Sequence, residues 1–172
     1  MKKLLQLLLV LVFASAMQAQ DTPKPRTGLK FYRVNFSIFE LEDGKKINER
    51  NYSLPVNSVD GNPRSGTIRV GTRVPITSGE GQVTYIDVGM NIDCDVTEQG
   101  EKFILSSSLD ITSFALPDQN ANPRAGGNPI LRQVKQHFIA LLPAGKPTLV
   151  TSIDDTNSKK RLQVEATVTR VE

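Results

Sequence analysis

The sequence predicts an all-β fold, an antiparallel sandwich or partly rolled sheet of about eight strands. Apolar and polar residues alternate over 86–96, the longest such run in the chain. A period of two with one apolar face is typical of a half-buried antiparallel strand. Similar runs follow one another with turn-forming residues between them, which favours a sandwich or a barrel-like sheet. Beyond the first nineteen residues, no segment has the 3.6-residue apolar period of a helix.

The first nineteen residues have the pattern of a secretory signal peptide. Lys2 and Lys3 form a basic start, an apolar run occupies 4–13, and small residues offer cleavage after Ala16 or Ala19. The apolar run is shorter than the ~20 residues that a membrane-spanning helix needs, so we expect removal of this segment rather than its retention as an anchor. The mature chain is therefore expected to be exported and to contain no transmembrane helix.

The charge of the mature chain argues against a nucleic-acid partner. The full sequence has 21 basic and 18 acidic residues, and the leader holds two of the lysines and no acid, which leaves 19 against 18. No basic block remains that would form a nucleic-acid surface. The chain has a single cysteine, Cys94, which excludes an internal disulfide. Its place on the apolar face at 86–96 predicts a small buried hydrophobe, and an intermolecular disulfide or a reactive thiol is the alternative.

A β-hairpin is predicted at 30–57, after a flexible, Pro-containing linker at 20–28. Apolar residues alternate on both sides of Asp43-Gly44, a pair that hairpin turns favour. The polar stretch that follows, 58–66, is predicted to be a loop.

A second group of strands surrounds the longest alternation. A short strand is predicted at 67–74, and Pro75 marks its end as an edge or a bend, because proline cannot donate a hydrogen bond to a neighbouring strand. The segments 82–97 and 102–113 are predicted to pair as a hairpin.

The remaining chain begins with a long loop at 115–129, rich in Pro, Gly and Asn. A loop of this length without structure of its own is often an interaction segment. Three further strands are predicted to follow, at 130–142, at 148–153 and from Arg161 to Val168. Together, residues 29–172 are predicted to form one all-β domain.

The residue inventory predicts no catalytic residues, no cofactor-binding residues and no metal site. The single histidine, His137, is expected on a sheet surface rather than as a general base. Asp93 and Asp95 share a strand face with Glu98 just beyond them, so a calcium site of oxygen ligands is conceivable. The regular alternation favours the other interpretation, a solvated polar face opposite a packed one. An enzyme is therefore the least favoured class of function.

Several motifs, taken in order along residues 67–171, resemble the secretin domain of type II and type III secretion systems. A Val-Pro step is followed by a polar loop, an aromatic residue and "DVG", then by "LDITSF" at 109–114 and "LPAGKPTLVTSIDD" at 142–155. The resemblance implies structural roles, not catalytic ones, for Val74, Pro75, Tyr85, Asp87, Val88 and Gly89. It also implies an exported, non-enzymatic β-domain with a structural or assembly role in protein secretion or the cell envelope.

The chain also departs from that family in ways that leave other functions open. Only about forty residues separate the leader from the motifs, and they are predicted to form one hairpin rather than the ring domains of secretins. A short polar turn at 154–160 stands where secretins have a lip segment. The expected partners are further copies of the chain or a protein of the envelope or secretion complex, in the periplasm, at the outer membrane or outside the cell. The alternative is a free periplasmic β-sandwich that binds a protein or a surface ligand.

Overall fold

The predicted all-β antiparallel fold is confirmed. The computed structural model describes residues 28–77, 82–114, 131–156 and 158–171. All the regular elements in these ranges are strands: β1 (Leu29–Glu42), β2 (Lys45–Val59), β3 (Asn62–Arg64), β4 (Gly66–Thr77), β5 (Val83–Gln99), β6 (Lys102–Phe114), β7 (Leu131–Pro143), β8 (Thr148–Asp154) and β9 (Lys160–Val171). The predicted leader, nearly all of the predicted linker and the predicted loop at 115–129 lie outside the described residues.

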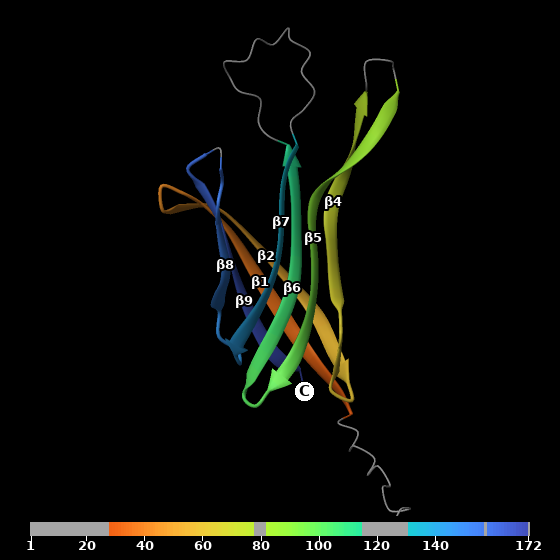
Figure 1. Ribbon diagram of the computed structural model, residues 1–172, viewed down its shortest axis with the longest axis vertical. Coiled ribbons are helices and arrows are strands. Elements are labelled where there is room, and N and C mark those ends of the chain that lie inside the picture. Colours follow the sequence, from red (N-terminus) through yellow and green to blue (C-terminus); the bar gives the residue numbers. More distant parts are fainter. Residues whose placement is uncertain (1–27, 78–81, 115–130, 157, 172) are drawn as a thin grey trace, which may run out of the picture.

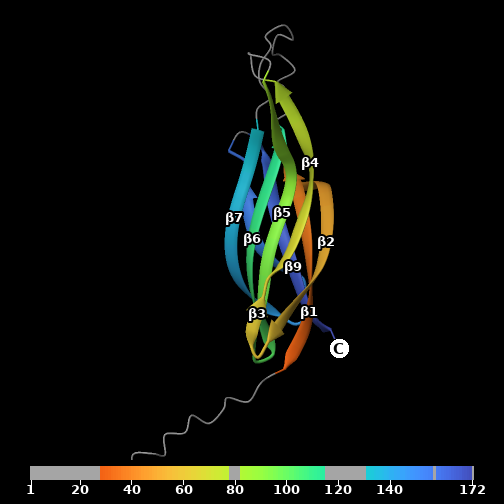
Figure 2. The same cartoon turned by 90° about the vertical axis from the view of Figure 1, so that its right-hand side faces the viewer.

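The strands form two sheets that pack face to face (Figures 1 and 2). The first sheet has the order β3-β2-β1-β9-β8, and the second sheet has the order β4-β5-β6-β7. Neighbouring strands are antiparallel throughout. The chain passes from the first sheet to the second at Gly66, where a Cβ atom would lie only 2.6 Å from Val56 Cγ1. Glycine at this corner lets the two sheets approach each other.

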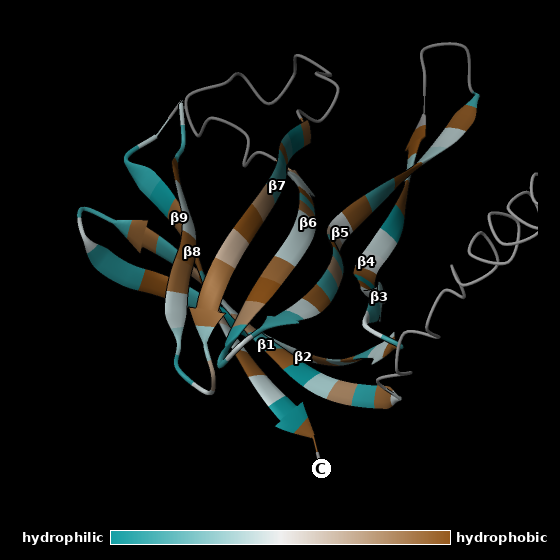
Figure 3. Cartoon of the chain, turned by 60° about the horizontal axis from the view of Figure 1, so that its bottom comes forward, coloured by the Kyte–Doolittle hydropathy of each residue, from teal (hydrophilic) through white to brown (hydrophobic). Residues whose placement is uncertain are grey.

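The space between the sheets is filled by the apolar faces that the alternation predicts, and Figure 3 shows hydrophobic and hydrophilic segments alternating along the strands. From β5 come the buried side chains of Met90, Ile92, Cys94 and Val96. The first sheet supplies Tyr32, Val34, Phe36, Leu54, Val164 and Val168, among others. The rings of Tyr32 and Phe103 meet edge to face across the core, with centroids 5.6 Å apart. Burial of these side chains provides the main stabilisation of the sandwich.

Two details of the strand prediction were wrong. The segment 58–66, predicted as a loop, contains the three-residue strand β3, which continues the first sheet beside β2. The strand predicted to end near Pro75 continues to Thr77, with Pro75 opposite Tyr85 in the ladder. Because β4 is an edge strand, Pro75 can lie within it, which agrees with the expectation that it marks an edge.

The alternation over 86–96 predicts that Ile86, Val88, Met90, Ile92, Cys94 and Val96 are buried together, and this prediction was wrong at one end. Ile86 and Val88 are only half-buried. They lie where β5 has already separated from β6, since the β5–β6 ladder begins at Gly89 and Thr112. The hairpin of β4 and β5 projects past the other strands at this point (Figure 1). The sequence pattern gives the face of a strand but not the length over which a second layer covers it.

An ionic contact joins the two sheets at the opposite end of the sandwich. Glu98 of β5 accepts hydrogen bonds from Lys30 of β1 and from Arg170 of β9, the latter with Nε to Oε1 at 3.0 Å. Burial raises the pKa of Glu98, but the hydrogen bonds from Lys30, Arg170 and Tyr32 outweigh it and hold that pKa below its ordinary value. Glu98 is thus a charged link between the sheets.

We expect this link to weaken in acid. A carboxylate whose pKa is depressed by folding stabilises the folded state above its unfolded pKa, near 4.5, and this contribution is lost as the pH falls through the folded pKa. Because Arg170 is half exposed, the contribution at neutral pH should be about 1 kcal/mol. Urea unfolding of wild type and of Glu98→Gln should therefore differ at pH 7, and the difference should shrink as the pH falls below 4.5 and through the folded pKa. If the difference in unfolding free energy between the two proteins does not shrink on acidification, Glu98 is not a charged link between the sheets.

Candidate interaction surface

Of the positions that resemble secretin motifs, those given structural roles in the sequence analysis lie together on the projecting hairpin: Val74, Pro75, Tyr85, Asp87, Val88 and Gly89. We call residues 70–77 of β4 and 83–89 of β5 the arm. The ladder pairs Val74 with Ile86, Pro75 with Tyr85, Arg73 with Asp87, Thr72 with Val88 and Gly71 with Gly89. Residues that the sequence places in two separate motifs, Val74-Pro75 and the run from Tyr85 to Gly89, thus form one local structure.

A pair of glycines brings β4 and β5 unusually close at the base of the arm. Gly89 has a φ of 157°, and a Cβ atom there would lie 2.1 Å from the Val70 carbonyl oxygen and 2.4 Å from Gly71 Cα. A Cβ on Gly71 would lie 2.7 Å from the Val88 oxygen. Neither position leaves room for a side chain, so glycine is required for this approach of the two backbones. The same site marks where β5 leaves β6.

The arm carries exposed apolar side chains on both of its faces. Val70 on one face is 51% exposed, and Val83 and Tyr85 on the other are 50% and 61% exposed. Arg73 Nε donates to Asp87 Oδ1 at 2.9 Å, and this hydrogen bond lowers the pKa of Asp87. Because the charges of Arg73 and Asp87 are paired with each other, the contacts that the arm offers a partner are mainly apolar.

The second sheet ends in two long unpaired edges. Within the described residues, β4 pairs only with β5 and β7 pairs only with β6. The outer face of β7 exposes Ile139 and Leu141, by 68% and 50%, and the half-buried Ile104 of β6 lies opposite Leu141 in the ladder. An open edge with apolar side chains beside it is the kind of surface that another strand can extend.

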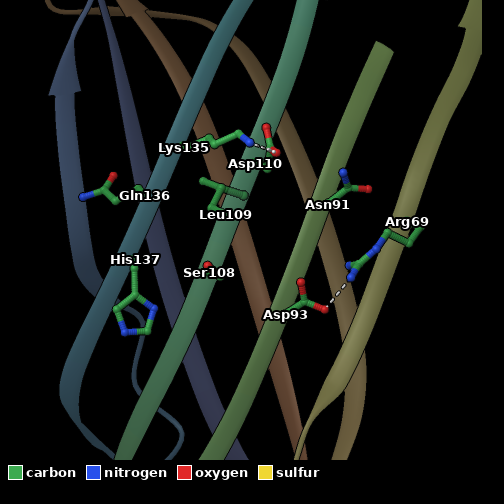
Figure 4. Close-up of a pocket in the computed structure, with 9 residues that line it drawn as sticks. All are labelled: Arg69, Asn91, Asp93, Ser108, Leu109, Asp110, Lys135, Gln136 and His137. Atoms are coloured by element: carbon green, nitrogen blue, oxygen red, sulfur yellow. Dashed lines mark hydrogen bonds and ion pairs between the residues drawn. The ribbon is translucent and has the colours of Figure 1, made fainter. Parts of the chain in front are cut away.

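Between the two edges, the outer face of the second sheet forms a shallow polar groove of about 480 Å³ (Figure 4). Arg69 Nη2 donates to Asp93 Oδ1 at 2.6 Å, and Lys135 Nζ lies 3.4 Å from Asp110 Oδ2. His137 lies at the β7 side of the groove. Its acids and bases are paired with each other, so the groove has no excess of one charge with which to attract an ion.

The structure does not bring the sequence's candidate metal ligands together. Asp93 and Asp95 face outward, whereas Glu98 points to the opposite side of the sheet and bonds Lys30 and Arg170. No three His, Cys, Asp or Glu side chains gather as a metal site would need in the part of the chain that the structure describes. Cys94 is buried, and burial, with Asp95 and Asp93 nearby, raises the pKa of its thiol to about 12. Such a thiol is a poor nucleophile.

Sequence reasoning missed the exposed apolar face of β7, although a signal for it exists. Residues 138–142 (FIALL) are apolar at five consecutive positions, so both faces of this strand are apolar. One face, with Leu142, packs in the core, and the other carries Ile139 and Leu141. A run of this kind indicates either a strand covered on both sides or one with an apolar surface left for a partner.

Among the described residues there is no helix with the length and apolar character needed to cross a bilayer.

No family model matches the chain, and no curated protein matches it. A comparison with solved structures finds matches to secretins.

ExeD of Aeromonas hydrophila has 9% identity and a TM-score of 0.46, and the match covers 83% of this chain and 46% of ExeD. The chain in the type II secretion outer-membrane complex of Klebsiella pneumoniae, which contains PulD, PulS and a PulC domain, has 11% identity and a TM-score of 0.49, with 84% and 38% covered. The type II secretin GspD of enteropathogenic Escherichia coli has 8% identity and a TM-score of 0.48, with 95% and 74% covered. The chain thus spans less than half the length of the first two structures. Each of these TM-scores is below 0.5, and secretins are the family that the sequence motifs resemble.

Proposed function

We propose that this chain is an exported, non-enzymatic β-domain that acts by assembling with other chains, and that residues 29–172 form one secretin-like domain with a structural role in protein secretion or the cell envelope. The expected place is the periplasm or the outer membrane. The leader-like first residues and the ordered secretin-like motifs support export and this role. The partners we propose are further copies of the chain or a protein of the same complex.

The observation that carries the proposal is the pair of open edges on the second sheet. β4 and β7 are 12 and 13 residues long, and each leaves one side of its backbone unpaired within the described residues. Monomeric proteins commonly protect such edges with charges, bulges or short strands. The β7 edge has exposed Arg132 and Lys135 in its first half, but toward Pro143 it lies beside exposed Ile139 and Leu141. Pairing of β7 of one copy with β4 of the next would continue the sheet and cover these side chains.

The lack of a catalytic role is supported by the chemistry of the titratable groups. The thiol of Cys94 is buried with a raised pKa, and the acids of the groove are paired with Arg69 and Lys135. The second candidate function is that of a free sandwich that binds a protein or a surface ligand. The groove of Figure 4 favours it, because its paired charges could exchange partners with a polar ligand.

A crosslinking experiment separates the two functions. Thr67 of β4 and His137 of β7 are both exposed and lie in one row across the sheet, Thr67–Asp93–Ser108–His137. Two variants are prepared, Thr67→Cys and His137→Cys. Each is recovered from the envelope fraction, and its N-terminus is sequenced to establish that the leader has been removed. On mixing, a bis-maleimide should join the two variants. The native Cys94 should remain unreactive because it is buried and its pKa is about 12.

The control is Leu149→Cys, an exposed position on β8 of the first sheet. It should give no crosslink with Thr67→Cys. Adding Ile139→Lys and Leu141→Lys to the His137→Cys chain should reduce the crosslink at least fivefold while leaving the circular dichroism spectrum unchanged, because both side chains are exposed. Equal crosslinking at position 149, or none between 67 and 137 in concentrated protein, would favour the free sandwich.

A further inference from the structure

An exposed apolar patch lies at the end of the molecule opposite the arm. Leu29 is the direct cross-strand neighbour of Val59, and Phe31 is the direct neighbour of Val171. All four side chains are on the outer face of the first sheet, with exposed fractions of 56%, 37%, 45% and 40%. We call these four residues the terminal patch. In Figure 1 this end carries the start of β1 and the chain end marked C, and in Figure 3 the tip of β9 is hydrophobic.

Arginines lie beside the terminal patch. Arg64 of β3 continues the row Arg64–Asn57–Phe31–Val171, and Arg33 of β1 lies in the next outward position after Phe31. Both are exposed, and neither has an ion pair within the described residues. Of the nearby acids, Asp60 accepts a hydrogen bond from the Gly28 amide, and Glu172 follows Val171 in sequence.

From this arrangement we propose that the terminal patch binds the surface of a membrane containing anionic lipid. Phe31 and Leu29 insert among the acyl chains near the headgroups, while Arg33 and Arg64 contact lipid phosphates. Exposed aromatic and aliphatic side chains beside arginines are the features by which a protein lies on a bilayer surface without crossing it. This binding does not depend on the proposed assembly, since it uses the outer face of the first sheet, whereas the proposed assembly uses the edges of the second sheet.

The size of the patch favours lipid over protein. A specific protein interface buries ~800 Å² on each partner. Four side chains that are each about half exposed present much less apolar area than that. A lipid surface needs no complementary shape and gains from each basic residue separately, so a small patch beside arginines is sufficient for reversible binding.

Vesicle flotation tests the proposal on the exported protein. Wild type should float with phosphatidylglycerol–phosphatidylethanolamine vesicles, float poorly with phosphatidylcholine vesicles, and be released by high salt. Leu29→Ser with Phe31→Ser should lower the partition coefficient at least tenfold. Arg33→Gln and Arg64→Gln should each lower it about fivefold on anionic vesicles, the factor that corresponds to ~1 kcal/mol per basic residue near such a surface.

The matched control is Leu149→Ser, which removes a leucine of similar exposure from the same outer face at a distance from the patch. It should bind as wild type does. All variants share one N-terminus, so lipid binding by the first residues would cancel in the comparison. Equal binding by the Leu29→Ser/Phe31→Ser variant, or no flotation of wild type, would overturn the proposal. Photocrosslinking from position 31 to a protein, without flotation, would assign the patch to a protein partner instead.

Discussion

Replacing Ile92 with Asp should abolish folding. Ile92 is 1% exposed in the middle of β5, and its cross-strand neighbours on the core face are Ile68 of β4 and Leu109 of β6. An aspartate here would place an unpaired charge among apolar side chains, at a cost of several kcal/mol, while a whole domain has a stability of only ~5–15 kcal/mol. The protein should be recovered as aggregate, or as a soluble chain without a cooperative thermal transition in circular dichroism.

The matched control for this change is Asn91→Asp. It introduces the same side chain into the same strand one position earlier, where the residue is exposed on the outer face. Since surface substitutions usually change stability by less than ~0.5 kcal/mol, this variant should unfold much as wild type does. A folded, cooperative Ile92→Asp protein would show that the assignment of the core face is wrong.

Replacing Gly89 with Ala should destabilise the protein by roughly 1–3 kcal/mol and loosen β4. The added methyl group would lie 2.1 Å from the Val70 oxygen and 2.4 Å from Gly71 Cα, and both obstacles are backbone atoms that cannot rotate away. Relief requires β4 to move from β5, which costs stability of the order seen for overpacking. Urea unfolding gives the size of the effect, and hydrogen exchange of the β4 amides should show its location.

Gly100→Ala is the control, because Gly100 also has a positive φ, 63°, yet has open space around it. Its substitution should cost only the local strain of about 1–2 kcal/mol and leave exchange in β4 unchanged. If Gly89→Ala does not accelerate exchange in β4 relative to Gly100→Ala, the close approach is not what requires glycine at the base of the arm.

The fold could be predicted largely because period-two patterns report directly on strands with one covered face. Ile92, Cys94 and Val96 are buried as that pattern requires. Ile86 and Val88 continue the same pattern but are half-buried, because the arm extends beyond the first sheet. Which strands stack over which depends on contacts between residues far apart in sequence, and alternation carries no information about them.

The interaction surface could be predicted only in part. The motif residues from Val74 to Gly89 were identified in sequence order, and the ladder between β4 and β5 brings them together. The terminal patch could not be foreseen, since Val59 and Val171 are far from Leu29 and Phe31 in sequence and join them only because β1 pairs with both β2 and β9. The link from Glu98 to Lys30 and Arg170 joins residues more than sixty positions apart for the same reason.

Assembly through the edges of the second sheet is the central claim, and sedimentation velocity of the exported protein tests it most directly. Measured over a range of concentrations with and without detergent, wild type should sediment as a discrete oligomer in at least one condition. The Ile139→Lys/Leu141→Lys variant should sediment as a folded monomer in both. A wild-type protein that remains strictly monomeric at high concentration in both conditions, with no envelope protein captured by crosslinking, would contradict the account.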